Sequence, residues 1–165
     1  MADGTGLTPE QKELVRKSWD IMKKDVKSNG VDLFLRLFKA HPNWQTYFKQ
    51  FKDLTLEEVA VSPKMRAHGT TVMQSFTALV DNLDDIDCLL VLIEKIVRNH
   101  YPRGVDVEHY KNLKIVMTLW LVAHLGDALD DVTAESWSIT VDTIIAVASQ
   151  VIGKIGTENG TENGT

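Results

Sequence analysis

Two histidines lie within the apolar faces of predicted helices, among leucine, isoleucine and valine. His68 falls in the stretch KMRAHGTTVMQSF, and His100 ends the stretch LLVLIEKIVRNH. An imidazole in an apolar interior needs a group that accepts its nitrogen lone pair, and a metal ion does so. The separation of 32 residues is long enough for one helix to leave His68 and for another to return on the opposite side of a planar guest. The pair therefore suggests a haem held between two helices.

Helical periodicity turns both imidazoles toward the interior. His68 shares its row with Val72, four residues on, and His100 follows Ile96 by the same interval. Gly69, beside His68, allows a second backbone to approach closely. Either histidine alone is more simply interpreted as a core residue with a hydrogen-bonded ring. Two of them on consecutive long helices, with an aromatic corner nearby, favour a ligand pair.

The elements that must position these histidines are all helical. Nearly every long segment has the helical period and none alternates like a strand. The first predicted helix begins at Pro9, with Thr8 as its cap, and the second begins after a polar break at 27–30. A third helix is predicted from Pro63 to about Leu83, and a fourth ends at His100. Two more are predicted over 107–125 and over 134–155, the last with Thr133 as its cap. The aromatic residues of 44–51 predict a short helix and corner. The sequence thus predicts one all-α domain of about seven to eight helices over residues 1–155.

Composition narrows the class of protein. The chain has 165 residues, 44% of them hydrophobic, which suits a single domain with a real core. A formal net charge of −5 does not suggest the excess of basic residues that nucleic-acid-binding proteins have. The single cysteine forms no intrachain disulfide, and the N-terminus has no signal-peptide pattern, so we expect a cytoplasmic protein. No apolar run reaches the length of a membrane span, and the polar GTEN repeat of 156–165 is predicted to be a disordered tail.

Several motifs together give the chain a family resemblance. They are Trp19 in the first helix, LFLRLFKAHP at 33–42, YFKQFKDL at 47–54, SPKMRAHGTTVM at 62–73 and IVRNHYPRGV at 96–105. The chain resembles a globin over almost all of residues 7–153. It is similar to the intracellular and nerve globins of bivalve molluscs and to neuroglobin-like proteins, and less similar to vertebrate myoglobin. The resemblance implies a globin fold that encloses haem b between a distal and a proximal helix.

The resemblance implies roles for five residues around the iron. His100 matches the proximal histidine, which binds iron. His68 matches the distal histidine, which donates a hydrogen bond to bound dioxygen or binds iron as a sixth ligand. Phe34 matches the distal wall, Val72 the position beside the gas ligand, and Phe48 the corner phenylalanine that stacks on the porphyrin.

Four more residues are expected around the rim of the cofactor. Ile96 lies on the same helical row as His100. Arg103 either reaches a haem propionate, as in similar bivalve globins, or is an ordinary surface arginine. Val105 and Tyr110 either close the proximal rim or pack as ordinary helix residues.

The remaining histidines have structural interpretations. His41 is expected to cap a helix, His109 to be exposed, and His124 to lie in the core or at an interface.

The function that the resemblance implies is reversible binding of dioxygen at ferrous iron, for storage or transport, with carbon monoxide and nitric oxide as related ligands. The alternative is a six-coordinate, bis-histidyl protein in redox chemistry, nitric oxide chemistry or oxygen sensing. A helical interaction module without cofactor would leave His68 and His100 unexplained. No enzyme activity is expected, because Phe34 supplies no polar group to cleave an O–O bond. Charges at Lys64, Arg66 and Arg98 on the outer faces of the histidine helices favour a monomer or weak homodimer.

Overall fold

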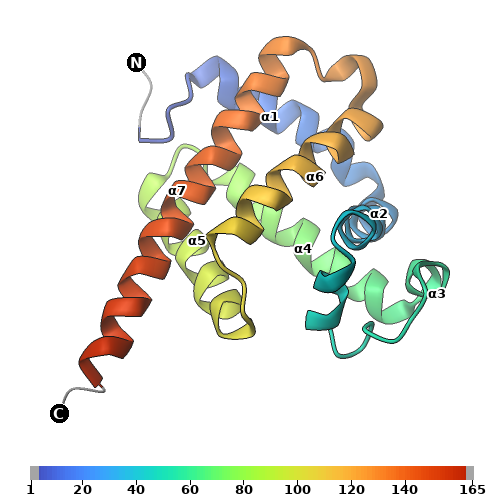
Figure 1. Cartoon of the computed structure of the whole chain (residues 1–165). Coiled ribbons are helices and arrows are strands. Elements are labelled where there is room, and N and C mark those ends of the chain that lie inside the picture. Colours follow the sequence, from blue (N-terminus) through green and yellow to red (C-terminus); the bar gives the residue numbers. More distant parts are fainter. Residues whose placement is uncertain (1–3, 163–165) are drawn as a thin grey trace.

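The computed structural model describes residues 4–162, and over this range the chain folds into helices with no strand (Figure 1). The α-helices are α1 (Pro9–Met22), α2 (Val26–Ala40), α3 (Leu56–Val61), α4 (Pro63–Asp81), α5 (Ile86–His100), α6 (Val107–Leu125) and α7 (Asp131–Glu162). Four short 3-10 helices join them: η1 (Lys23–Asp25), η2 (Pro42–Tyr47), η3 (Tyr101–Arg103) and η4 (Gly126–Ala128). The predicted all-α class and the expected number of helices are confirmed.

Local capping chemistry starts the helices that carry the fold. Thr8 and Gln11 form a reciprocal capping box at the start of α1, and Pro9 occupies the first turn. Ser62 accepts a hydrogen bond from the backbone N–H of Met65 at the start of α4. These starts follow the sequence prediction, because each depends on residues within one helical turn.

Helices α2 and α4 cross with their backbones in close contact. Gly30 on α2 lies against Gly69 on α4, so closely that a Cβ atom on Gly30 would sit 2.6 Å from the Gly69 carbonyl carbon. The expected approach of a second backbone at Gly69 is therefore confirmed. The predicted polar break at 27–30 is wrong: α2 runs through it from Val26, because the Asn29 amide donates to the Met22 carbonyl at 2.8 Å. The chain bends earlier, at η1.

An aromatic cluster joins four helices at the centre of the core. Trp19 on α1 is fully buried, and its ring lies 5.7 Å from Phe76, 6.2 Å from Trp120 and 5.8 Å from Trp137, measured between centroids. These partners belong to α4, α6 and α7. The three indole N–H groups donate to Thr77, to the carbonyl of Asn29 and to Ser18, respectively. The cluster is thus both close-packed and fully hydrogen-bonded.

Helix α7 is longer than predicted at both ends. It begins at Asp131, where Asp130 rather than the expected Thr133 caps it by accepting from the Thr133 N–H at 2.8 Å. At the other end it continues to Glu162 through most of the segment predicted to be disordered. An ion pair supports the extension, because Arg98 on α5 donates to both carboxylate oxygens of Glu158, at 3.0 and 3.1 Å. The rest of the predicted tail, 163–165, lies outside the described residues.

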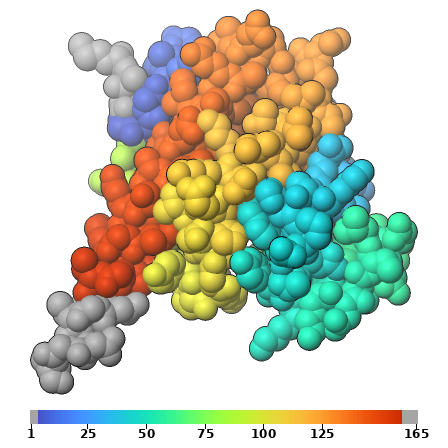
Figure 2. Space-filling view, viewed as in Figure 1, coloured from blue at the N-terminus to red at the C-terminus, as the bar shows by residue number. Residues whose placement is uncertain are grey.

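Helices α6 and α7 lie side by side on one face of the molecule, with the corner of residues 41–50 packed against the start of α6 (Figure 2). By length and composition, Asp131–Glu158 of α7 would satisfy the criteria for a membrane-spanning helix. Core helices of globular proteins satisfy the same criteria, and α7 contacts α1, α5 and α6.

Candidate functional site

His68 lies on α4 in a box of aromatic rings. Its imidazole is 4.8 Å from the ring of Phe34 on α2 and 5.3 Å from the ring of Phe48 at the corner, and both pairs are edge-to-face. Val72, one turn further along α4, packs partly buried against the core. Within residues 4–162 the ring nitrogens of His68 have no hydrogen-bond partner. Burial lowers the pKa of His68 below its usual range, so the ring is neutral at neutral pH.

His100 is the last residue of α5, and its orientation is fixed by its own helix. Its Nδ1 atom lies 2.7 Å from the carbonyl oxygen of Ile96, one turn earlier. Because a carbonyl only accepts, Nδ1 carries the proton and donates it. The lone pair of the neutral ring is then on Nε2, which is the tautomer that metal-ligating histidines use. The side chain is therefore prepared as a ligand by α5 itself.

Burial is not the only influence on the His68 ring. The electrostatic effects of His100 and of Arg103 add to burial and lower the pKa of His68 further. Helices α4 and α5 are in contact, and His100 lies near enough to His68 to affect its pKa; that both imidazoles serve one cofactor stays a prediction. Arg103 is exposed and donates to the side-chain oxygen of Asn99 at 2.9 Å and to the Asn99 carbonyl. The bond to Asn99 suits an ordinary surface arginine, whereas the effect of Arg103 on the pKa of His68 suits a residue near the cofactor. Both predicted roles of Arg103 therefore stay open.

Tyr110 on α6 carries a polar group that the protein does not satisfy. Its hydroxyl is the one buried side-chain oxygen or nitrogen without a hydrogen-bond partner in the described part of the chain. Burial raises the pKa of Tyr110 to about 12, so the phenol stays protonated and can donate. Val105, in the segment that leads into α6, is also partly buried. An orphaned donor in an interior is expected where a bound group supplies the acceptor.

These residues fit a haem better than a bare metal ion. No group of three or more His, Cys, Asp and Glu side chains comes together anywhere in residues 4–162. A metal held by protein side chains alone would need such a group. Two imidazoles from different helices, aromatic walls at Phe34 and Phe48, and the unsatisfied hydroxyl of Tyr110 instead match a planar iron porphyrin with polar edges.

The structure also assembles a cluster that the sequence analysis missed. His109 was expected to be exposed, but its side chain is only 17% exposed. Its Nδ1 lies 2.7 Å from the Asp106 carboxylate, and its Nε2 lies 3.1 Å from the hydroxyl of Tyr47. The Asp106–His109 spacing at a helix start is a local signal that could have revealed the first contact. Tyr47 is 62 residues away, and nothing local predicts it.

The other two histidines are structural, as predicted. His41 follows the last residue of α2, and its backbone N–H bonds to the Leu37 carbonyl while its ring stacks on Trp44 at 4.2 Å. His124 on α6 is bound to the Asp32 carboxylate of α2 at 2.8 Å.

Comparison with known proteins gives the family. The globin family model matches residues 31–148. Hemoglobin-2 of Phacoides pectinatus is 33% identical over 144 residues, which cover 85% of this chain and 91% of the relative. A globin of Busycotypus canaliculatus is 34% identical over 119 residues, covering 70% and 81%.

Solved structures of globins and haem proteins share the fold of this chain. A Drosophila melanogaster globin superposes with a TM-score of 0.80 at 27% identity, covering 87% of this chain and 94% of that one. A hexacoordinated haem protein from an anhydrobiotic tardigrade superposes with a TM-score of 0.81 at 20% identity, covering 88% and 94%, and shows likeness of fold. The chain, with its all-helical fold, belongs to the globin family.

Proposed function

We propose that this globin holds haem b on His100 and binds dioxygen reversibly at the ferrous iron, for oxygen storage or transport. The observation that carries the proposal is the hydrogen bond from His100 Nδ1 to the Ile96 carbonyl, which leaves the Nε2 lone pair available for iron. The relatives named hemoglobin support the same function. Haem supplies a ferrous centre that binds a diatomic gas: dioxygen, carbon monoxide or nitric oxide.

On the distal side, we assign three residues to the gas. The neutral ring of His68 has no competing partner and can turn an N–H toward a bound ligand, where a dry surrounding strengthens the hydrogen bond. Phe34 and Val72 limit the space beside it and exclude water. Each of these roles is a contact with the gas, so we assign the chain a binding role.

Around the cofactor, we assign contact roles to the remaining predicted residues. Phe48 presents a ring next to His68 and can stack on the porphyrin. Ile96 and Val105 supply apolar contacts on the His100 side. Tyr110 can donate its unsatisfied hydroxyl to a polar edge, and Arg103 can pair with a carboxylate if it leaves Asn99.

One observation favours a second candidate, a bis-histidyl haem protein with sensing or redox duty. The ring of His68 has no partner within the described residues, and so nothing holds it back from binding iron as a sixth ligand. A tardigrade protein described as hexacoordinated has the same fold. In that case a gas must displace His68, and the apparent affinity falls in proportion to the open fraction.

The absorption spectrum of the dithionite-reduced protein separates the two candidates. A broad single visible band before carbon monoxide means five-coordinate iron and supports oxygen binding with an open distal side. Sharp split bands mean that His68 also binds iron. A protein that shows no Soret band after haem reconstitution would overturn both candidates and would favour a cofactor-free module.

Substitution tests the ligand assignment. His100→Ala should lose haem or bind it weakly, because the substitution removes the ring that we assign as the proximal iron ligand. His68→Leu should retain haem and release dioxygen faster. His124→Ala is the matched control: its ring pairs with Asp32, away from the site, so the spectrum should not change. Normal haem binding by His100→Ala would show that the proximal assignment is wrong.

We further propose a cytoplasmic monomer or weak homodimer without nucleic-acid or membrane partners. Exposed apolar side chains on α6, at Ile115, Leu119 and Val122, form a narrow stripe that supports weak self-association. A stable dimer in sedimentation at low micromolar concentration would contradict this proposal.

A further inference from the structure

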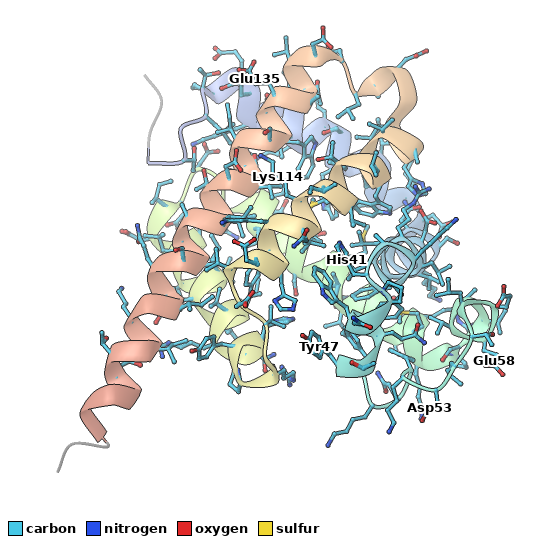
Figure 3. The ribbon with its side chains drawn as sticks, viewed as in Figure 1. His41, Tyr47, Asp53, Glu58, Lys114 and Glu135 are labelled. Atoms are coloured by element: carbon cyan, nitrogen blue, oxygen red, sulfur yellow. The ribbon has the colours of Figure 1, made fainter. Side chains whose placement is uncertain are left out.

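An open groove lies between α6 and α7, with a volume of about 100 Å³. Most of its surface is apolar and comes from Met117, Leu121, Leu129, Ala134, Trp137 and Val141. Lys114, labelled in Figure 3, lies at its edge where the two helices run side by side. An apolar cavity of about 150 Å³ binds benzene, so this α6–α7 groove has room for about one branched group of four or five carbons. Its size suits a small organic molecule.

The edge of the groove carries three polar side chains, of which two are already bonded. Lys114 donates to the Asp142 carboxylate at 2.7 Å, so its positive charge has a partner. The Thr118 hydroxyl donates to the carbonyl of Lys114 at 2.8 Å. The third, Ser138, is half-buried and its hydroxyl has no hydrogen-bond partner within residues 4–162. A hydroxyl both donates and accepts, so Ser138 is available to the polar group of a ligand.

The surface around the groove is acidic. Over residues 107–153, which span both helices, six side chains are acidic and only two are basic. On α7, Asp131, Glu135 and Asp142 share one helical row with Ser138, at spacings of four, three and four residues. Neither Asp131 nor Glu135 forms an ion pair with another of the described residues. The helix dipole favours carboxylates in the first turn, but it does not account for those further along the helix.

These charges select the class of ligand. A carboxylate at Ser138 would be repelled by the acidic row of α7, and Lys114 already has its own carboxylate. A neutral alcohol would gain nothing from the row. An ammonium group bonded to the Ser138 hydroxyl would be attracted by carboxylates on either side of it. Lys114 bonds to Oδ1 of Asp142, which leaves Oδ2 as a second acceptor for the ammonium group.

We propose that the α6–α7 groove is a binding site for small primary ammonium compounds with a branched aliphatic or aromatic body. The apolar body lies on Met117, Leu121 and Trp137, and the ammonium group lies at Ser138. None of the residues that line the groove belongs to the proposed haem site. The site therefore adds a second ligand to the molecule and does not depend on the function proposed for the iron.

The first test is a titration of the full-length protein with 3-methylbutylammonium, followed by nuclear magnetic resonance of ¹³C-labelled methionine methyl groups. The reduced carbon monoxide form is used because it is diamagnetic. The chain has five methionines, so Met117→Leu identifies the Met117 signal. That signal should shift and saturate with a Kd of about 1 mM, which is reasonable for a ligand of this size.

Two compounds with the same carbon skeleton isolate the role of the charge. The neutral 3-methylbutan-1-ol should bind about fivefold more weakly than the ammonium compound, because it loses the attraction of the acidic row. The anionic 4-methylpentanoate should give no saturable shift. Added salt should weaken binding of the ammonium compound and leave binding of the alcohol unchanged.

Variants separate the apolar body from the ammonium group. Ala134→Leu places a larger side chain in the groove and should abolish binding of the ammonium compound and of the alcohol. Glu135→Gln and Ser138→Ala should each weaken only the ammonium compound, by about threefold. Glu57→Gln removes an exposed carboxylate on α3 and is the matched control, which should bind as the wild type does. Thermal unfolding verifies that each variant is folded.

A groove that is only a gap in the packing would give different results. Absence of a saturable Met117 shift, or a shift confined to other methionines, would overturn the site. Equal affinities for the ammonium compound and the alcohol would overturn its charge selectivity, as would wild-type affinity in both Glu135→Gln and Ser138→Ala. A chain that takes up no haem would instead defeat the proposed function, and the same titration would then be made on the haem-free full-length chain.

Discussion

Substitution of Gly30 by alanine gives the sharpest test of the packing that builds the distal side. The change adds a single methyl group on α2 at its crossing with α4. That methyl carbon would lie 2.6 Å from both the carbonyl carbon and the oxygen of Gly69, whereas ordinary contact begins at 3.4 Å. The obstacle is backbone, which cannot rotate away, so the two helices must separate by roughly 0.8 Å at this point.

Two opposing contributions set the change in stability. Alanine favours a helix over glycine by about 1 kcal/mol. Overpacking of a rigid contact opposes folding by about 3 kcal/mol, at the upper end of its usual range. The net expectation is a loss of about 2 kcal/mol, or a fall in melting temperature of about 4–8 °C for a domain of this size.

Gly153→Ala is the matched control, because Gly153 is an exposed helical glycine on α7 with nothing within 4 Å of its added Cβ. It should raise the melting temperature by about 2–4 °C, through helix propensity alone. Both variants are measured by thermal and urea unfolding monitored by circular dichroism. Because Phe34 and His68 lie near the same crossing, Gly30→Ala should also widen the distal side and speed carbon monoxide binding. If the two variants shifted stability equally and in the same direction, the close contact of α2 and α4 would be refuted.

Three further outcomes follow from named contacts. Tyr110→Phe removes an unsatisfied buried hydroxyl and should stabilise the haem-free chain by about 1 kcal/mol in urea unfolding, yet it should hasten haem transfer to an acceptor protein. Burial raises the pKa of Asp32, but the hydrogen bonds from Arg36 and His124 outweigh burial and hold the pKa below its usual range. Asp32→Asn should therefore destabilise the protein by about 1 kcal/mol at pH 7, and the difference between variant and wild type should vanish as pH falls through the lowered pKa of Asp32; a difference that persists in acid would contradict the pairing. Glu158→Gln should speed amide hydrogen exchange in residues 156–162 while the melting temperature stays unchanged.

The parts of the fold that the sequence predicted are those set within a helical turn. Thr8 and Ser62 mark helix starts because the backbone N–H groups that they accept from, those of Gln11 and Met65, are three residues away. The inward rows of His68 and His100 follow in the same way from helical spacing. That both rows face one planar guest was inferred from two such rows joined by a short connector, and it stays a prediction.

The errors share a different cause, which is a partner distant in sequence. The stretch around Gly30 has the composition of a break, but it is helical where Gly30 packs against Gly69 on another helix and Asn29 donates to the Met22 carbonyl. His109 was expected to be exposed because Tyr47 lies far away in the chain. The segment after Ile155 is polar throughout, and its helix is supported by Arg98 from α5. None of these contacts changes the spacing of apolar residues in the segment that makes it, so the hydrophobic periodicity of the sequence does not reveal it.

The tryptophan cluster determines what a folding experiment on this chain can observe. Trp19, Trp120 and Trp137 lie close enough to share excitation energy, so their emission reports the assembly of α1, α6 and α7 as one signal. Helix α5 contains no aromatic residue other than the imidazole of His100. Melting of α5 in the haem-free chain would therefore pass unseen in fluorescence, and a chain that appears folded by this probe could still lack its iron-binding helix.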